Sequence, residues 1–247
     1  MAMKTKWFVC FVVWAFCVVP VSVGMIVEDG FESYSSGSIV GQGGWESYDL
    51  LGYQFVVQEA TIFEGNKTLY CNALADNVIG KQGNLLTDGR QTVYIRTEDR
   101  NSWKYSPSGN VQVRMTENLW SQQYGSFMFV SFYQNGTVGY NGTVFDTYVD
   151  NEWIPLDMEW RSIDASARVR VNDGTWTNWE PIIVYDSFIG FDYVGLNFDN
   201  SGGVGGGVYI DALGDSFPNV PEPASATLLM TGLIAISLLV LRRRRSR

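Results

Sequence analysis

The sequence predicts an all-β fold for residues 25–216, an antiparallel β-sandwich of the jelly-roll type. Short runs with alternating apolar side chains and many β-branched or aromatic residues recur along this region. Gly, Asn and Asp separate these runs at turn positions, and no long window has the periodicity of an amphipathic helix. Many short strands separated by such turns are typical of two antiparallel sheets packed face to face.

Turn signals separate the expected strands along the chain. Asn135-Gly136 lies between two β-rich runs and predicts a tight hairpin, and Asp173-Gly174 predicts a second hairpin. The segments with strand patterns are 109–120, 125–149, 154–164, 167–179, 188–200 and 206–215.

Both ends of the chain have the composition of membrane-targeting segments. Residues 1–24 join two lysines, a short apolar core and small residues, which is the pattern of a cleaved secretory signal peptide. Residues 217–223 form a linker, residues 224–241 an uncharged apolar run long enough for a transmembrane helix, and residues 242–247 a basic tail. The basic residues of that tail hold it on the cytoplasmic side, with the domain outside; four of them are Arg242, Arg243, Arg244 and Arg245.

Charge and composition exclude several classes of function for the middle of the chain. The whole chain has 17 basic residues, of which two lie in the signal segment and five in the tail, so ten remain in the domain. Against 25 acidic residues, they give the domain a net charge of about −15. Such a surface repels nucleic acid and anionic lipid. The chain has no histidine, which excludes Ser-His-Asp catalysis and His-based metal sites. Cys71 is the one cysteine of the mature chain, so we expect a buried apolar residue and no internal disulfide.

The C-terminal segment resembles the PEP-CTERM sorting signal of Gram-negative bacteria. The resemblance is carried by Pro221, Glu222 and Pro223, then the apolar helix, then the arginine cluster. It implies recognition by an exosortase, removal of the tail after signal peptidase has cut the other end, and delivery to the cell surface or the extracellular matrix. Proteins with this signal accompany exopolysaccharide production. The resemblance therefore implies an inner-membrane intermediate and a temporary anchor.

The domain itself resembles concanavalin A-like and laminin G-like jelly rolls. The resemblance rests on an opening motif and on a closing strand, Val208 to Leu213, in which an acidic residue follows Tyr-Ile. The opening motif consists of Phe31, Glu32, Tyr34, Gly37, Gly41, Gln42, Gly44 and Trp45. Members of this class include lectins, glycan hydrolases, lyases and adhesive modules, so the fold leaves the function open.

Asp157 and Glu159 are the catalytic candidates, because glycoside hydrolysis uses paired carboxylates. They alternate with apolar residues in the strand segment 154–164, so they share the face that we expect in solvent. Jelly-roll glucanases carry three acids on the matching strand, of the pattern Glu-x-Asp-x-x-Glu, and the third acid is missing here. We therefore expect a solvated charged face and no enzyme.

Aromatic residues and a glycine-rich segment are the remaining site candidates. Trp176 and Trp179 follow the Asp173-Gly174 turn and are candidates for stacking on a sugar, whereas Trp45, Trp153 and Trp160 are expected in the core. Asp199 and Asp211 flank a run of glycines and are weak candidates for calcium, although a loop without a cofactor is the simpler interpretation.

The sequence thus favours a surface-sorted β-sandwich with a structural or interaction role in the envelope or exopolysaccharide matrix. A lectin-like module and a carbohydrate-active enzyme remain the alternatives.

Overall fold

The computed structural model describes residues 24–47, 55–72, 77–107, 109–117, 125–185, 187–199 and 206–214. In these ranges the chain forms β-strands and a short 3-10 helix, η2, at Arg100–Ser102. The strands are β1 Gly37–Ser38, β2 Trp45–Ser47, β3 Phe55–Gln58, β4 Thr68–Cys71, β5 Asn77–Leu86, β6 Gly89–Thr97, β7 Val111–Thr116, β8 Phe127–Phe132, β9 Thr137–Tyr140, β10 Thr143–Thr147, β11 Ile154–Arg161, β12 Ser166–Val171, β13 Glu180–Pro181, β14 Phe191–Phe198 and β15 Val208–Asp211.

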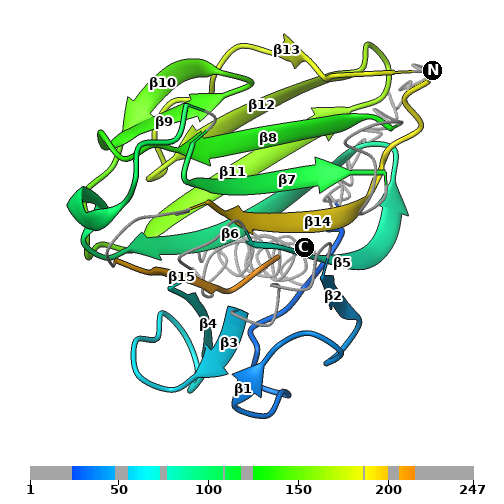
Figure 1. Cartoon of the computed structure of the whole chain (residues 1–247). Coiled ribbons are helices and arrows are strands. Elements are labelled where there is room, and N and C mark those ends of the chain that lie inside the picture. Colours follow the sequence, from blue (N-terminus) through cyan, green and yellow to red (C-terminus); the bar gives the residue numbers. More distant parts are fainter. Residues whose placement is uncertain are drawn as a thin grey trace, which may run out of the picture.

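The strands form two sheets, and every strand pairing in the described ranges is antiparallel. The eight-stranded sheet has the order β1-β3-β4-β15-β6-β11-β12-β13, and the seven-stranded sheet the order β10-β9-β8-β7-β14-β5-β2 (Figure 1). The edge strands β10 and β13 lie at one end of the sandwich, and the edge strands β1 and β2 lie toward the other. The predicted antiparallel β-sandwich is confirmed.

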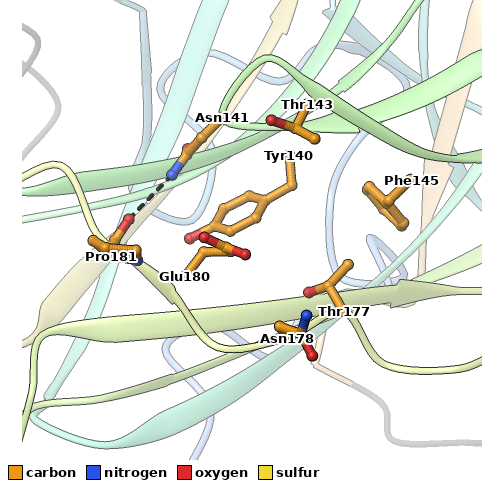
Figure 2. A pocket seen from close by; sticks show the side chains of 8 residues that line it. All are labelled: Tyr140, Asn141, Thr143, Phe145, Thr177, Asn178, Glu180 and Pro181. Carbon is orange, nitrogen blue, oxygen red and sulfur yellow. Dashed lines mark hydrogen bonds between the residues drawn. The ribbon is translucent and has the colours of Figure 1, made fainter.

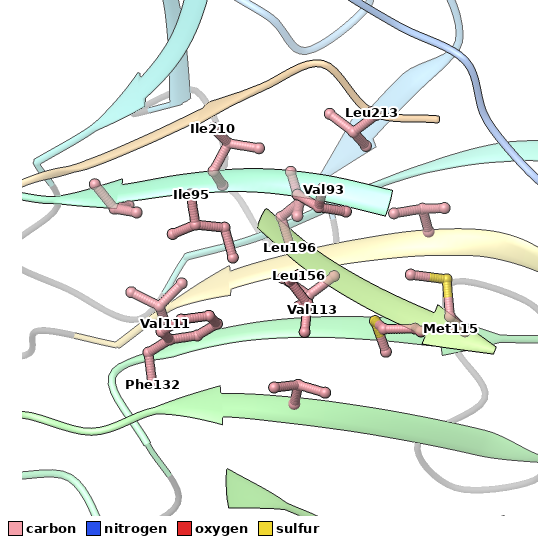
Figure 3. Close-up of a cluster of buried hydrophobic side chains, with 14 of the residues drawn as sticks. Val93, Ile95, Val111, Val113, Met115, Phe132, Leu156, Leu196, Ile210 and Leu213 are labelled. Carbon is pink, nitrogen blue, oxygen red and sulfur yellow. The ribbon is translucent and has the colours of Figure 1, made fainter. Parts of the chain in front are cut away.

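Strict alternation in the long strands produces the core. In β7, Val111, Val113 and Met115 are buried between the sheets, while Gln112 and Arg114 face outward. The inner faces of both sheets interdigitate in this way, as Figure 3 shows for one part of the core. Trp45, Trp160 and Cys71 are buried as predicted. Trp153 lies outside this core cluster, half-buried against Phe63, so its predicted core position is wrong.

One of the two predicted hairpin turns lies where the sequence predicts it, and the other is shifted by one residue. Asn135-Gly136 connects β8 to β9 as predicted, with Gly136 at φ 83° and its N–H donated to the Tyr133 carbonyl at 2.9 Å. The second turn lies one residue earlier than expected. Asn172 and Asp173 both have positive φ, 51° and 55°, which is the geometry of a type I′ turn, so these two residues are its central pair.

A buried ion cluster explains the opening motif. Asp29 accepts a hydrogen bond from the Trp45 indole at 3.0 Å and forms an ion pair with Lys81 at 2.8 Å. Tyr34 also donates to Asp29, and Lys81 contacts the Tyr34 hydroxyl at 2.9 Å. The motif residue Glu32 accepts two backbone N–H groups of the loop at 66–67. These motif residues therefore anchor the N-terminal segment to the sheets.

The predicted signal peptide, Pro-Glu-Pro linker, membrane helix and basic tail lie outside the described residues, apart from the last residue of the signal segment. Within the described ranges, no helix has the length and apolar character needed to cross a membrane.

Candidate functional site

Two neighbouring hollows of about 280 and 240 Å³ lie on the outer face of the seven-stranded sheet. Pro107, Tyr133 and Gly142 line both of them, so we treat them as one feature and call it the outer groove. Its further lining residues are Gln112, Arg114, Thr116, Phe127, Phe129, Tyr105, Gln134, Asn135, Thr137 and Val144.

A row of aromatic rings follows β8 along this groove. Alternation in β8 turns Phe127 and Phe129 outward, with ring centroids 6.0 Å apart and planes at 28°. Tyr185 continues the row beyond Phe127 at 6.1 Å and 30°, and its side chain is exposed. Tyr133 follows the end of β8, and Tyr105 lines the hollow of about 240 Å³. From Phe127 to Tyr133 an extended chain covers about 20 Å, so the row can contact a ligand several rings long.

Polar side chains on β7 and β14 lie beside this aromatic row. Gln112 accepts hydrogen bonds from Arg114, so the guanidinium is held over the sheet. Asn197 stands opposite Gln112 on the neighbouring strand, is buried, and leaves its Oδ1 without a hydrogen-bond partner among the described residues. The described lining contains no carboxylate. Amide, guanidinium and aromatic groups bind neutral polar ligands, whereas acid–base chemistry of the glycosidase type requires a pair of acids.

The structure places the catalytic candidates on the opposite side of the molecule, on the outer face of the eight-stranded sheet. Asp157 is only 2% exposed, so the predicted solvated position is wrong for this residue. Arg90 and Arg170 each contact one of its carboxylate oxygens at 2.6 Å, and the Thr92 hydroxyl donates to it at 2.7 Å. The loss of solvent around Asp157 follows from these partners, which cover the strand.

Glu159, the second candidate, is partly exposed and forms an ion pair with Arg168 at 2.6 Å. Both candidate carboxylates are therefore engaged by arginines, and a substrate would have to displace those arginines before either could transfer a proton.

Trp176 and Trp179 cover this charged face of the eight-stranded sheet. Arg168 stacks on both rings, at 4.7 and 4.6 Å from their centroids, and Arg170 stacks on Trp176 at 4.8 Å. Arg161 lies over Trp179 at 4.0 Å. The two indole rings that the sequence analysis proposed for stacking on a sugar are thus in contact with guanidinium groups of the same sheet.

Asp199 and Asp211 lie at the ends of strands from different sheets. Asp199 follows β14 and interacts with the Ser106 hydroxyl at 3.2 Å. Asp211 ends β15, is fully buried, and accepts backbone N–H groups from Phe63 and Ala212. Burial raises the pKa of Asp211 to about 6, while these N–H donors act in the opposite direction. In the described residues no group of three or more acidic or cysteine side chains is arranged to hold a metal ion.

Fold and site together define an antiparallel β-sandwich with one aromatic outer face. In structure the chain is similar to a sialidase, with 11% sequence identity and a TM-score of 0.52 over 76% of this chain. The chain spans 18% of that sialidase. Two further similar structures are the catalytic domain of a glycoside hydrolase family 131 protein from Coprinopsis cinerea (13% identity, TM-score 0.49, 77% of this chain and 93% of that one) and peanut lectin (14%, 0.44, 77% and 99%).

At these identities the likeness concerns the fold alone. No family model matches the chain, and no curated protein matches its sequence.

The sequence interpretation missed the groove residues. Phe127 and Phe129 alternate with Met128 and Val130, so every residue of this stretch is apolar and alternation could not tell the outer face from the core. The neighbouring strand β7 carries the signal that could have identified them. Its polar residues Gln112 and Arg114 face outward, and Arg114 pairs with Phe129, so Phe129 must face outward too.

Proposed function

We propose that this domain is a non-catalytic carbohydrate-binding module of an exported protein, and that the outer groove holds a polysaccharide chain. The aromatic row along β8 is the observation that carries the proposal, because aromatic faces stack on sugar rings while amide and guanidinium groups hydrogen-bond their hydroxyls. The absence of a carboxylate among the described lining residues supports binding without cleavage.

The net charge of the domain narrows the ligand to neutral or weakly charged glycans. About −15 charges on residues 25–216 repel a polyuronate or a sulfated chain at long range. Arg114 is the only charged residue among those described in the groove lining, so it can contribute one local contact to an occasional acidic substituent.

Retention on immobilised polysaccharides tests the proposal. Phe127→Ala and Phe129→Ala should each weaken retention at least about tenfold, the loss typical of an aromatic residue that dominates an interface. Trp176→Ala is the matched control on the opposite sheet and should bind like the wild type. Release of reducing ends is measured in the same incubations. Unchanged retention in both phenylalanine variants would refute the outer groove as the binding site. Release of reducing ends would show that the domain is an enzyme and not a binding module.

We also propose that the C-terminal segment sorts this module to the cell surface or extracellular matrix. The support is the order of Pro221-Glu222-Pro223, apolar run and arginine cluster, together with the signal-peptide pattern at the other end. Deleting residues 221–223 should leave the protein in the inner-membrane fraction, whereas deleting the equally long segment 216–218 should not. Equal surface delivery of both deletions would contradict an exosortase signal.

A further inference from the structure

A third cavity, of about 490 Å³, lies across the β9–β10 turn from the outer groove, at the end of the sandwich where the edges of the two sheets approach each other. One wall comes from β9 and β10, the edge of the seven-stranded sheet, and the other from β13 and the residues before it, the edge of the eight-stranded sheet. We call it the edge pocket. Its lining residues are Tyr140, Asn141, Thr143, Phe145, Thr177, Asn178, Glu180 and Pro181 (Figure 2).

Two polar groups in the edge pocket are incompletely hydrogen-bonded among the described residues: Oδ1 of Asn141 has no donor, and the Tyr140 hydroxyl has the Asn141 side-chain amide beside it but no acceptor for its proton. Tyr140 is only 3% exposed, and Figure 2 shows its phenol pointing from β9 toward the carboxylate of Glu180. A buried polar group that makes no hydrogen bond costs stability, so its presence at a cavity indicates a ligand that completes it.

The chemistry of both groups can be assigned. The Nδ2 of Asn141 donates to the Pro181 carbonyl at 3.3 Å, so its acceptor oxygen is the atom left free. Burial raises the pKa of Tyr140, a hydrogen bond from the Asn141 side chain partly offsets this rise, and the charge of Glu180 adds to it. The phenol therefore stays neutral at physiological pH and can both donate and accept a hydrogen bond.

We infer that the edge pocket binds a single neutral monosaccharide unit. Hydroxyls of such a ring can donate to Asn141 Oδ1 and to Glu180, and one of them can pair with the Tyr140 hydroxyl. Phe145 and Pro181 supply an apolar wall for a ring face. The cavity volume lies within the range of small-ligand sites. Glu180 is the only charged residue in the described lining, so the pocket rejects uronic acids and other anions.

This site is independent of the outer groove. The hairpin turn between β9 and β10 separates the two, with Asn141 lining the edge pocket and Gly142 lining both hollows of the groove. An end or a branch of a glycan chain can therefore be held here without passing through the groove, and the two sites can fail separately.

Titration calorimetry with glucose, galactose, mannose and glucuronate tests the inference on the purified protein. At least one neutral sugar should bind, and glucuronate should not. Tyr140→Phe should weaken the binding about tenfold, because one hydrogen bond is lost while the ring remains. Phe129→Ala, in the groove, should leave this binding unchanged.

Stability of the free protein is the second readout, and it separates a binding role from a folding role. Tyr140→Phe should raise the unfolding midpoint, because it removes a buried O–H group whose proton has no acceptor in the free protein. Tyr148→Phe is the matched control: its buried hydroxyl donates to the Tyr133 carbonyl at 2.7 Å, so its loss should lower the midpoint and leave sugar binding intact. No binding of any neutral sugar, or binding that Tyr140→Phe leaves unchanged, would overturn the inference.

Discussion

Replacing Asp157 with Asn tests whether the charged outer face of the eight-stranded sheet is a structural network. The carboxylate is 2% exposed and holds Arg90 and Arg170, whose side chains are 22% and 18% exposed. In the variant, an amide group faces two guanidinium groups and can accept from only one of them. Breaking a buried ion pair by removing one partner costs about 3–5 kcal/mol, and because the arginines reach solvent we expect the lower end, about 3 kcal/mol.

Glu159→Gln is the matched control on the same strand and the same face. Its ion pair with Arg168 is 24% and 30% exposed, so its loss should cost only about 0.5 kcal/mol. Urea unfolding of the purified proteins gives both values. The slope should stay constant, and the midpoint of Asp157→Asn should fall by about 1 M or more for a slope of 1–3 kcal/mol per molar.

Salt provides a further discrimination between the two variants. In 1 M NaCl the screening length is about 3 Å, so the small effect of Glu159→Gln should vanish while that of Asp157→Asn largely persists. Equal destabilisation by the two substitutions would show that Asp157 is not the centre of a buried network. A folded Asp157→Asn protein that has lost polysaccharide retention would show instead that this face, and not the outer groove, carries the function.

Two further predictions concern stability. Asp211 has a folded-state pKa of about 6 against an ordinary 3.8, so the stability it contributes is fully present only below pH 3.8 and is lost as the pH rises through 6. Relative to Asp211→Asn, the wild type should lose about 2 kcal/mol between pH 4 and pH 7, and a pH-independent difference in chemical denaturation would contradict this. Gly83→Ala places a Cβ 1.8 Å from the Ile26 carbonyl oxygen and should lower the free energy of unfolding by at least about 3 kcal/mol. In the control Gly195→Ala the new Cβ lies 3.6 Å from the nearest atom, so this variant should be tolerated. Thermal unfolding compares the two variants, and equal midpoints would refute the steric argument.

Local patterns were enough to predict the sheets but not what covers them. The alternation of Leu156, Met158 and Trp160 predicts their inward position, and all three are buried. The same alternation says only that Asp157 faces away from the core. Whether that face meets solvent depends on where Arg90 lies, 67 residues earlier in the chain, and on the arginines of the neighbouring β12. The alternation of side chains within one strand cannot predict an ion pair with a residue from a distant part of the chain.

The same limit applies to the sites. Glu180 and Tyr140 lie 40 residues apart in sequence and on different sheets, so only the approach of two sheet edges brings them to one cavity. The opening motif behaved differently, because Trp45 and Tyr34 lie close to Asp29 in sequence and meet it through a local turn. Motifs that act locally could be recognised in the sequence, whereas sites assembled from distant strands could not.

The contrast between the outer faces of the two sheets is the strongest argument for where ligands bind. On the eight-stranded sheet, Asp157 and Asp211 point away from the core and are nevertheless buried, because arginines, tryptophans and the loop at 63–64 cover them. On the seven-stranded sheet, Phe127 and Phe129 point outward, are half-buried, and line a hollow. Apolar rings left at a solvent-facing hollow cost free energy in the free protein, and a sugar face that stacks on them recovers it. The charged face therefore stabilises the fold, and the aromatic face is the proposed binding surface.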